Sequence, residues 1–277
     1  MLKQRVITAL LLLAVLLPAL FYSSIEPFAA LTLLLIGAGS WEWARLNGCA
    51  PRLAMAIGLG MGILMALIWF AGGLTVSLRL LWLAAGALWV LLAVAMLGRG
   101  VAGWSRWPAS LRLWCGLALI ACAWLALVQA RLLGLTFLLS VLLLVWMADI
   151  AAYFGGKTFG RRKLAPSISP GKSWEGAVSG LIGVLLMAAV WLWANRQGWG
   201  EATHLYAYLW SLGLLWAIPV LVGLTGMSVA GDLVESLVKR SAGVKDSSQL
   251  LPGHGGVLDR VDALVPVLPL AMMLSTF

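Results

Sequence analysis

Charged side chains are scarce in this chain, and no polar segment is long enough to bury a core of its own. Only 10% of the 277 residues are Asp, Glu, Lys or Arg, whereas 62% are hydrophobic, and the mean hydropathy is +1.00. This composition excludes a soluble globular domain, because such a domain needs a far more charged surface. The period-2 alternation of a transmembrane barrel is absent as well, so a membrane β-barrel is not expected.

Cysteine is also rare. The three cysteines are Cys49, Cys115 and Cys122, and none of them belongs to a CxxC pair. Isolated cysteines in apolar segments normally serve as small hydrophobic side chains. A zinc site is therefore not expected.

Long apolar runs recur along the whole chain instead. They are about 18 to 22 residues long, the length that a helix needs to cross a bilayer. Backbone polar groups in lipid must pair internally, so we predict an all-α, polytopic membrane protein with about nine transmembrane helices. The expected spans are 5–22, 25–46, 53–71, 77–97, 111–130, 132–154, 174–197, 205–226 and 257–276. The first follows a basic start without a clear A-x-A cleavage site and should be retained; the eighth should continue as a helix toward Arg240.

The basic residues predict the orientation of these spans. With the N-terminus in the cytoplasm, all but three of the 19 Lys and Arg residues fall on the cytoplasmic side, the exceptions being Arg79, Arg131 and Arg196. Such an excess is the usual sign of cytoplasmic loops. We therefore expect a cytoplasmic N-terminus and a C-terminus on the outer side. Topology and anionic headgroups also account for the net charge of +9 without any nucleic acid.

Polarity divides the chain into two parts. Residues 1–130 contain about five apolar spans and are expected to form a lipid-facing scaffold. Residues 131–277 hold nearly all of the unusual polar residues and two cytoplasmic loops, 155–173 and 241–256. We predict that this second part is catalytic.

One polar cluster lies where the eighth span is expected to leave the membrane. Its members, Asp232, Glu235, Ser236 and Lys239, are spaced i, i+3, i+4, i+7 and so share one face of a helix. A solvated helix face would explain the pattern. However, Asp232 lies close to an apolar span, and ionisable groups at that depth tend to be paired or functional.

A second cluster lies at the start of the last span. Asp259 and Asp262 share a helix face there, next to a Pro-Gly-His-Gly-Gly turn at 252–256. The helix dipole alone would favour these acids. The glycines and the free N–H groups of the helix start would also receive an anion, provided that a divalent cation joins it to the carboxylates. His254 is suited either to contact a phosphate or to shape the turn.

Two further segments carry candidate residues. Asp149 should lie below the membrane surface, where a lone carboxylate is a functional candidate unless it bonds a neighbouring helix. The Gly171-Lys172-Ser173 tripeptide resembles the end of a phosphate-binding loop, but Pro166 stands where that loop needs glycine and no strand is expected before it. An NTPase is excluded, although Lys172 and Ser173 precede a helix whose start would favour an anion.

Together these segments resemble the phosphatidate cytidylyltransferase family, also called CDP-diacylglycerol synthases. The matching residues of the family signature are Ser236, Lys239, Arg240, Lys245, Asp246, Ser248, Pro252, His254, Gly255, Gly256, Asp259, Arg260 and Asp262. An upstream block from Asp149 to Gly176 agrees too, except that Gly171 replaces a frequent Lys and Ser173 a frequent Thr. By motif, the resemblance covers the chain from Asp149 onward.

The resemblance implies that CTP and phosphatidate give CDP-diacylglycerol and pyrophosphate, in a bacterial cytoplasmic membrane with the site facing the cytoplasm. It implies Mg²⁺, with a second cation left open. The expected metal ligands are Asp232 and Asp259, with Asp149 and Asp262 as further candidates. The expected phosphate contacts are Lys172, Ser173, Lys239, Arg240, Lys245, His254, Gly255, Gly256 and Arg260. The expected catalytic residues are Asp232, Asp259, Lys239, Asp246 and Asp262. Of these, Asp246 and Asp262 would orient the Lys and Arg side chains. The choice between CTP and dCTP and the formation of a homodimer stay open.

Three other classes of membrane protein fit the pattern less well. A transporter would gather its ionisable residues near the bilayer midplane, whereas here they gather at one face. A CDP-alcohol phosphotransferase would carry a D-G-x-x-A-R string, which this chain lacks. A non-catalytic lipid-binding protein would not need Asp232 and Asp259.

Overall fold

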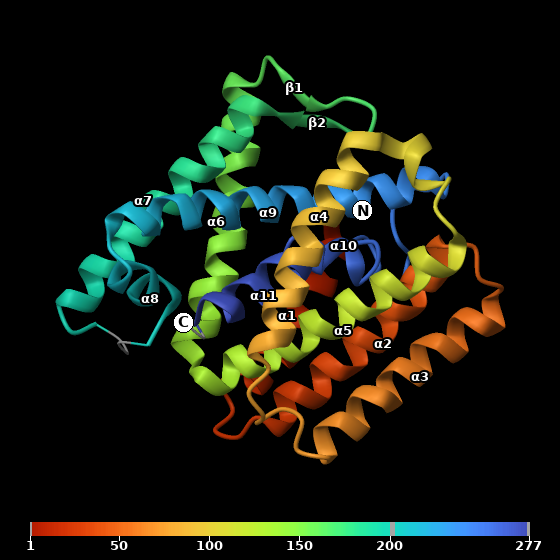
Figure 1. Cartoon of the computed structure of the whole chain (residues 1–277), viewed down its shortest axis with the longest axis horizontal. Coiled ribbons are helices and arrows are strands. Elements are labelled where there is room, and N and C mark those ends of the chain that lie inside the picture. The colour runs from red at the N-terminus through yellow and green to blue at the C-terminus, as the bar shows by residue number, and fades with distance from the viewer. Residues whose placement is uncertain (1, 200–202, 276–277) are drawn as a thin grey trace.

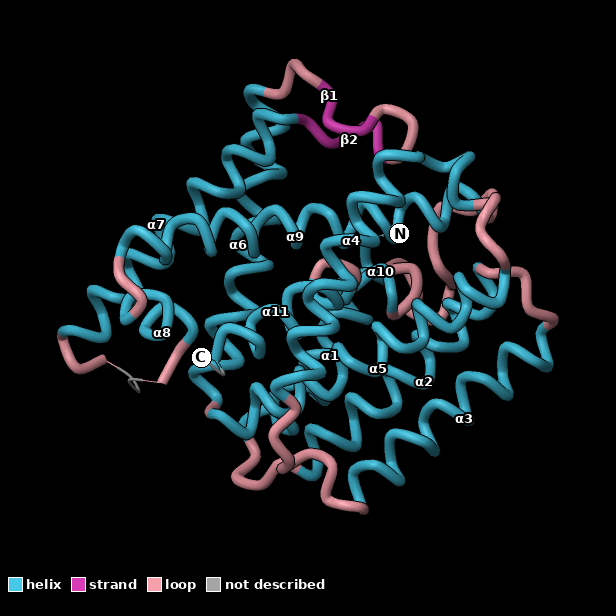
Figure 2. Tube along the Cα trace, in the orientation of Figure 1, coloured by secondary structure: helices cyan, strands magenta, loops and turns pink. Residues whose placement is uncertain are grey.

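The protein is almost entirely helical, as the sequence predicts. The computed structural model describes residues 2–199 and 203–275. The helices are α1 (Leu2–Phe21), α2 (Glu26–Leu46), α3 (Pro51–Phe70), α4 (Arg79–Trp104), α5 (Ala109–Leu133), α6 (Leu135–Phe159), α7 (Trp174–Arg196), α8 (Leu205–Ser211), α9 (Leu214–Ser241), α10 (Leu258–Val261) and α11 (Leu264–Ser275). The strands are β1 (Lys163–Ala165) and β2 (Ser169–Ser173), which project beyond α6 and α7 (Figures 1 and 2).

Several helix boundaries follow from single residues. Pro51 begins α3, where its missing N–H is no loss. Gly213 has a φ of +87°, which a side chain would disfavour, and it separates α8 from α9. The prediction of one uninterrupted span from residue 205 is therefore wrong, because the long helix begins only at Leu214.

Six of the described helices are long and apolar enough to cross a membrane, namely α3, α4, α5, α6, α7 and α9. Two shorter apolar stretches, Val6–Phe21 and Leu264–Ser275, lie in α1 and α11. Large apolar side chains such as Leu80 and Leu215 are 81% and 82% exposed, as expected where lipid replaces water. The helices fit a multi-pass membrane protein, while the count of nine spans and the side of each terminus stay predictions.

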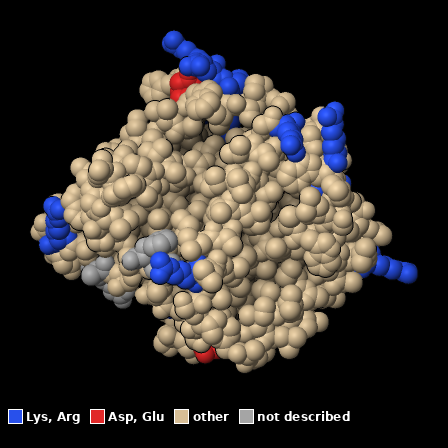
Figure 3. All heavy atoms as spheres, in the orientation of Figure 1, with Lys and Arg blue, Asp and Glu red and all other residues tan. Residues whose placement is uncertain are grey.

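The connections between helices lie toward two opposite ends of the molecule (Figure 1). Those after α2, α4, α6 and α9 lie toward one end, and those after α1, α3 and α5 toward the other. Hydrogen bonds agree: Thr8 of α1 donates to the Pro252 carbonyl at 3.0 Å, and Arg131 of α5 donates to the Leu20 carbonyl at 3.0 Å. The polar segments singled out in the sequence therefore gather at one end. Figure 3 shows Lys and Arg side chains near β1 and β2. Most of the rest of the molecular face seen in this view carries no charged side chains.

The loop before α7 contains a short antiparallel hairpin. Lys163 of β1 pairs with Ser173 of β2, and Ala165 pairs with Ser169. The expectation that no strand precedes Lys172 is therefore wrong. The sequence shows no alternation of apolar and polar residues here. The two short strands are held by hydrogen bonds to each other and do not cover a buried face. The exclusion of a phosphate-binding loop still stands, since Pro166 keeps the place of the required glycine.

One hydrophobic core joins the N-terminal and C-terminal parts of the chain. Helices α4 and α5 pack against α11, α4 also packs against α9, and α2 packs against α5. The core includes Trp82 and Phe137, both fully buried. The predicted boundary at residue 130 is not tested by this packing, but α2, α4 and α5 do more than face lipid.

Candidate active site

An open cleft of about 520 Å³ lies where β2 meets α6, α7 and α9. Lys172 of β2 and Asp232 of α9 line it and form an ion pair, with Nζ 2.7 Å from Oδ2. Both side chains are partly exposed, at 24% and 31%. Asp149 of α6 lines the same cleft. The structure thus brings together three residues that the sequence places in separate segments.

The close packing of α6 against α7 shapes this cleft. A Cβ at Gly180 would lie 2.7 Å from the Ala148 carbonyl oxygen, and one at Gly176 would lie 2.9 Å from the Ala152 carbonyl oxygen. Only glycine allows such an approach. Ser173 is buried and accepts a hydrogen bond from the Gly176 N–H at 3.1 Å, so it caps α7. Its predicted phosphate contact stays a prediction.

A buried charge network lies beside the cleft, on the C-terminal turns of α9. The Lys239 ammonium is 2.6 Å from Asp259 Oδ1 and 2.5 Å from Glu235 Oε2. All three side chains are at most 10% exposed. Buried charges are tolerated only when they are paired, so each of these groups depends on the others.

The second carboxylate oxygen of Asp259 holds the ends of the 247–256 loop. Asp259 Oδ2 accepts hydrogen bonds from the Ser247 N–H at 2.9 Å, the Ser247 hydroxyl at 2.8 Å and the Gly256 N–H at 2.7 Å. Gly255 has a φ of +86°, and a Cβ there would lie 2.7 Å from Asp259 Oδ2. Gly255 and Gly256 of the predicted turn therefore pack around Asp259.

Glu42 of α2 is a site residue that our sequence reasoning missed. Its side chain is fully buried and accepts hydrogen bonds from the same loop and from the start of α10. The rule that flags Asp149, a lone carboxylate within an apolar span, applies equally to Glu42 and would have found it.

A model of the cytidylyltransferase family matches residues 3–277 of the chain. The chain belongs to the cytidylyltransferase family. It is 41% identical over 278 residues to the phosphatidate cytidylyltransferase of Pseudomonas aeruginosa, covering 97% of this chain and 95% of that protein. It is 39% identical over 293 residues to the phosphatidate cytidylyltransferase of Haemophilus influenzae, with 97% and 96% covered. The phosphatidate cytidylyltransferase of Brucella suis is 35% identical, with 89% and 76% covered.

These matches confirm the family resemblance and show that the cytidylyltransferase is an enzyme, a nucleotidyltransferase. They cover the N-terminal half as well, which the sequence motifs did not. The roles of individual residues stay predictions.

The remaining predicted residues of the cytidylyltransferase lie around the loop. Arg240 donates to the carbonyl oxygens of Ile168 and Val244, and Arg260 donates to the His254 carbonyl. Lys245 and Asp246 line a separate open pocket next to Arg45 of α2. In this arrangement Arg240 and Arg260 brace loops, and their predicted phosphate contacts stay predictions. His254 Nδ1 is buried, with no hydrogen-bond partner among the described residues.

The carboxylates of the cytidylyltransferase have the donor chemistry that Mg²⁺ requires. The carboxyl groups of Asp149 and Asp262 both have charge–charge interactions with Asp232 and with Lys172. Among the described residues, no three Asp, Glu, His or Cys side chains form a metal site by themselves. Mg²⁺ commonly takes one or two carboxylates and completes its shell with water and substrate phosphates, so the residues fit this ion. As placed, Asp232 contacts Lys172 and Asp259 contacts Lys239.

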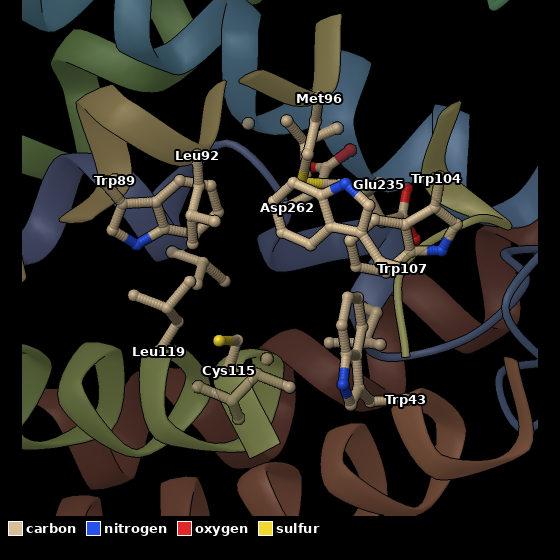
Figure 4. A pocket seen from close by; sticks show the side chains of 16 residues that line it. Trp43, Trp89, Leu92, Met96, Trp104, Trp107, Cys115, Leu119, Glu235 and Asp262 are labelled. Carbon is tan, nitrogen blue, oxygen red and sulfur yellow. The ribbon is translucent and has the colours of Figure 1, made fainter. Parts of the chain in front are cut away.

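An apolar pocket extends from the buried network toward the N-terminal helices (Figure 4). Trp43, Trp89 and Trp104 line it, and Glu235 and Asp262 lie at the side near Met96. Asp262 is within electrostatic range of Asp232, Lys172 and Lys239. The charge of this aspartate therefore interacts both with the cleft and with the buried network of the cytidylyltransferase.

Proposed function

We propose that this cytidylyltransferase transfers the cytidylyl group of CTP to phosphatidate and releases pyrophosphate. The product would be CDP-diacylglycerol, a precursor for phospholipid synthesis. The names of the three relatives support the lipid substrate. The observation that carries the proposal is the position of the cleft, where Lys172, Asp232 and Asp149 gather at one end of long apolar helices. A charged nucleotide and the headgroup of a membrane lipid can meet at such a boundary.

The reaction needs no covalent enzyme intermediate. A phosphate oxygen of phosphatidate attacks the α-phosphorus of CTP, a new P–O bond forms, and the bond to the β-phosphate oxygen breaks. The enzyme must bring two anions together and stabilise the charge of the transition state. Lys172 stands at the open cleft and is suited to neutralise phosphate oxygens once they replace its contact with Asp232.

Asp232 and Asp259 are our first choice for holding Mg²⁺, with Asp149 and Asp262 as further candidates and a second cation left open. The bound ion would supply positive charge to the triphosphate and to the leaving pyrophosphate. Lys239 holds Asp259 in place, and the charge of Asp262 interacts with Asp232, Lys172 and Lys239. Arg240, Lys245 and Arg260 would add positive charge around the loop, and Asp246 and Asp262 would orient these basic residues.

We further propose that the protein lies in the bacterial cytoplasmic membrane with the site facing the cytoplasm. The relatives are bacterial, and the polar segments of the chain lie at one end. A cytoplasmic site would meet CTP directly. The formation of a homodimer and the choice between CTP and dCTP stay open.

Product formation by the purified protein tests this function. We expect lipid-linked CMP when the protein is mixed with phosphatidate, radiolabelled CTP and Mg²⁺, and none when EDTA replaces Mg²⁺. Asp232→Asn serves as the matched variant, because it keeps the size of the side chain and removes the charge beside Lys172. The absence of product with both CTP and dCTP would contradict the proposal.

A further inference from the structure

Glu42 connects the N-terminal part of the chain to the signature loop. Its side chain is fully buried near the end of α2. Oε1 accepts hydrogen bonds from the Ser248 hydroxyl at 2.6 Å and the Val257 N–H at 2.9 Å. Oε2 accepts from the Leu258 N–H at 2.8 Å and shares the Ser247 hydroxyl, 3.1 Å away, with Asp259 Oδ2. All four donors belong to the segment that leads into Asp259.

This carboxylate has no cation beside it among the described residues, whose ion pairs involve other acids. A buried carboxylate without a counter-ion needs several hydrogen bonds to offset its lost hydration. Glu42 meets this need entirely from the loop and the start of α10. Its burial and the shape of the loop therefore depend on each other.

Ser247 links Glu42 to Asp259. Its hydroxyl oxygen is 3.1 Å from Glu42 Oε2 and 2.8 Å from Asp259 Oδ2, and its backbone N–H donates to the same Asp259 oxygen. At the end of the glycine turn, the Gly256 N–H donates to Asp259 and the next N–H, of Val257, donates to Glu42. The two carboxylates thus hold both ends of one loop.

The space around Gly256 shows how closely these groups pack. A Cβ at Gly256 would overlap the Ser247 hydroxyl and the Glu42 carboxylate. The N–H groups at the start of α10, which the sequence suggested for a substrate anion, donate to Glu42 instead. An anion does occupy this helix start, and it is a side chain of the protein itself.

We propose that Glu42 is a positioning residue of the cytidylyl transfer. Through Ser247 and the backbone of Val257 and Leu258, it holds Asp259 against Lys239 in the geometry that the reaction needs. The inference rests on the proposed function for its chemical meaning, and it assigns the N-terminal helices a direct part in the site.

Glu42→Gln tests this role because it keeps the shape of the side chain and turns one oxygen into a donor. That nitrogen would face two of the four donors, whichever way the amide turns. We expect kcat to fall about 10- to 100-fold, the effect that a small misplacement of a catalytic group produces. The KM for CTP should change less than kcat, since the Lys172–Asp232 cleft is untouched.

Two further variants separate positioning from general stability. Glu42→Asp keeps the charge at shorter reach and should recover part of the lost kcat, and it serves if Glu42→Gln fails to fold. Thr32→Val on the same helix removes a buried hydroxyl that accepts a 3.1 Å hydrogen bond from Trp124 but contacts no part of the loop. It should leave kcat unchanged.

The link through Ser247 predicts non-additive effects. If Glu42 acts through Ser247, then Glu42→Gln combined with Ser247→Ala should lose clearly less kcat than the product of the two single losses. Multiplicative losses, a Glu42→Gln kcat within about twofold of wild type, or a raised KM with unchanged kcat would each overturn the proposal.

Hydrogen exchange gives a readout that does not need activity. In Glu42→Gln, the amides of Val257 and Leu258 should exchange faster than in wild type and in Thr32→Val, because their acceptor is weakened. The amides of Ser247 and Gly256, which donate to Asp259, should follow because Asp259 is no longer held in place. Unchanged protection would overturn the positioning role. If the wild-type protein makes no CDP-diacylglycerol, the proposed function fails, while the exchange result still decides whether Glu42 orders the loop.

Discussion

At the residue scale, the buried charge network beside the cleft depends on Lys239. Its ammonium contacts Asp259 and Glu235 at once, and little water reaches the three groups. Removing one partner of a buried ion pair leaves an uncompensated charge, which typically costs about 3–5 kcal/mol. The pairing therefore explains why these residues should respond strongly to substitution, whatever they contact in the substrate complex.

Asp259→Asn is expected to abolish turnover while the protein still inserts in the membrane. The amide cannot pair with Lys239, and its NH₂ group would face donors wherever it points. We expect kcat to fall by more than about 100-fold, equivalent to roughly 2.7 kcal/mol. Turnover would be measured on detergent-purified protein.

Elution of Asp259→Asn as a single peak, as in wild type, is the control for folding. A loss of tenfold or less would argue against the proposed role of Asp259 in holding the metal.

Residue types in an apolar setting predicted most of the candidate site. The sequence indicates Asp149, Lys172 and Asp232 in three separate segments, and the structure places them in one cleft. Glu42 is a lone carboxylate in an apolar span, so the same rule singles it out as a candidate. Its partners lie more than two hundred positions later, and no local pattern reveals which groups it contacts.

At the scale of elements, the α6–α7 pair and its hairpin set the position of the cleft. The glycines of α7 let the two helices approach at the level of Asp149, and β2 carries Lys172 to the same place. The sequence predicted both helices closely, because their apolar runs are long. It missed the strands, which are short and pair only with each other.

Gly180→Ala should destabilise the protein and lower its activity. The new methyl group would lie 2.7 Å from the carbonyl oxygen of Ala148, the residue directly before Asp149. Overpacking of this kind costs about 1–3 kcal/mol. The fraction of protein that stays monodisperse after heating, measured over a temperature series, should show a lower midpoint.

Gly62→Ala is the matched control, since a Cβ at Gly62 of α3 meets nothing within 4 Å. Equal midpoints for the two variants would show that the α6–α7 contact is looser than the structure indicates.

At the scale of the whole molecule, the helices run between two ends and gather the polar segments at one of them (Figure 1). Successive connections lie at alternate ends, as the distribution of basic residues between the two sides predicts. Six of the described helices have the length and composition of spans, and the shared core ties α4 and α5 to α9 and α11. The side of the membrane for each end follows from charge alone and needs its own experiment.

Labelling of single cysteines in intact cells tests the orientation. After Cys49, Cys115 and Cys122 are replaced by Ser, a cysteine at exposed Ser77 should react with a membrane-impermeant maleimide. A cysteine at exposed Ser105, in the next connection, should react only after the cells are permeabilised. The reverse result would show that the positive-inside prediction is inverted.

The sequence by itself determined the helical fold, the family and most of the charged residues of the site, because helix periodicity, span length and motif spacing are local properties. The tertiary structure decided which of these residues meet. It placed Lys172 against Asp232 and Lys239 against Asp259, and it brought Glu42 to the signature loop. The physical reason is burial: a charge removed from water needs a partner, and only the packing of distant helices determines which partner is within reach.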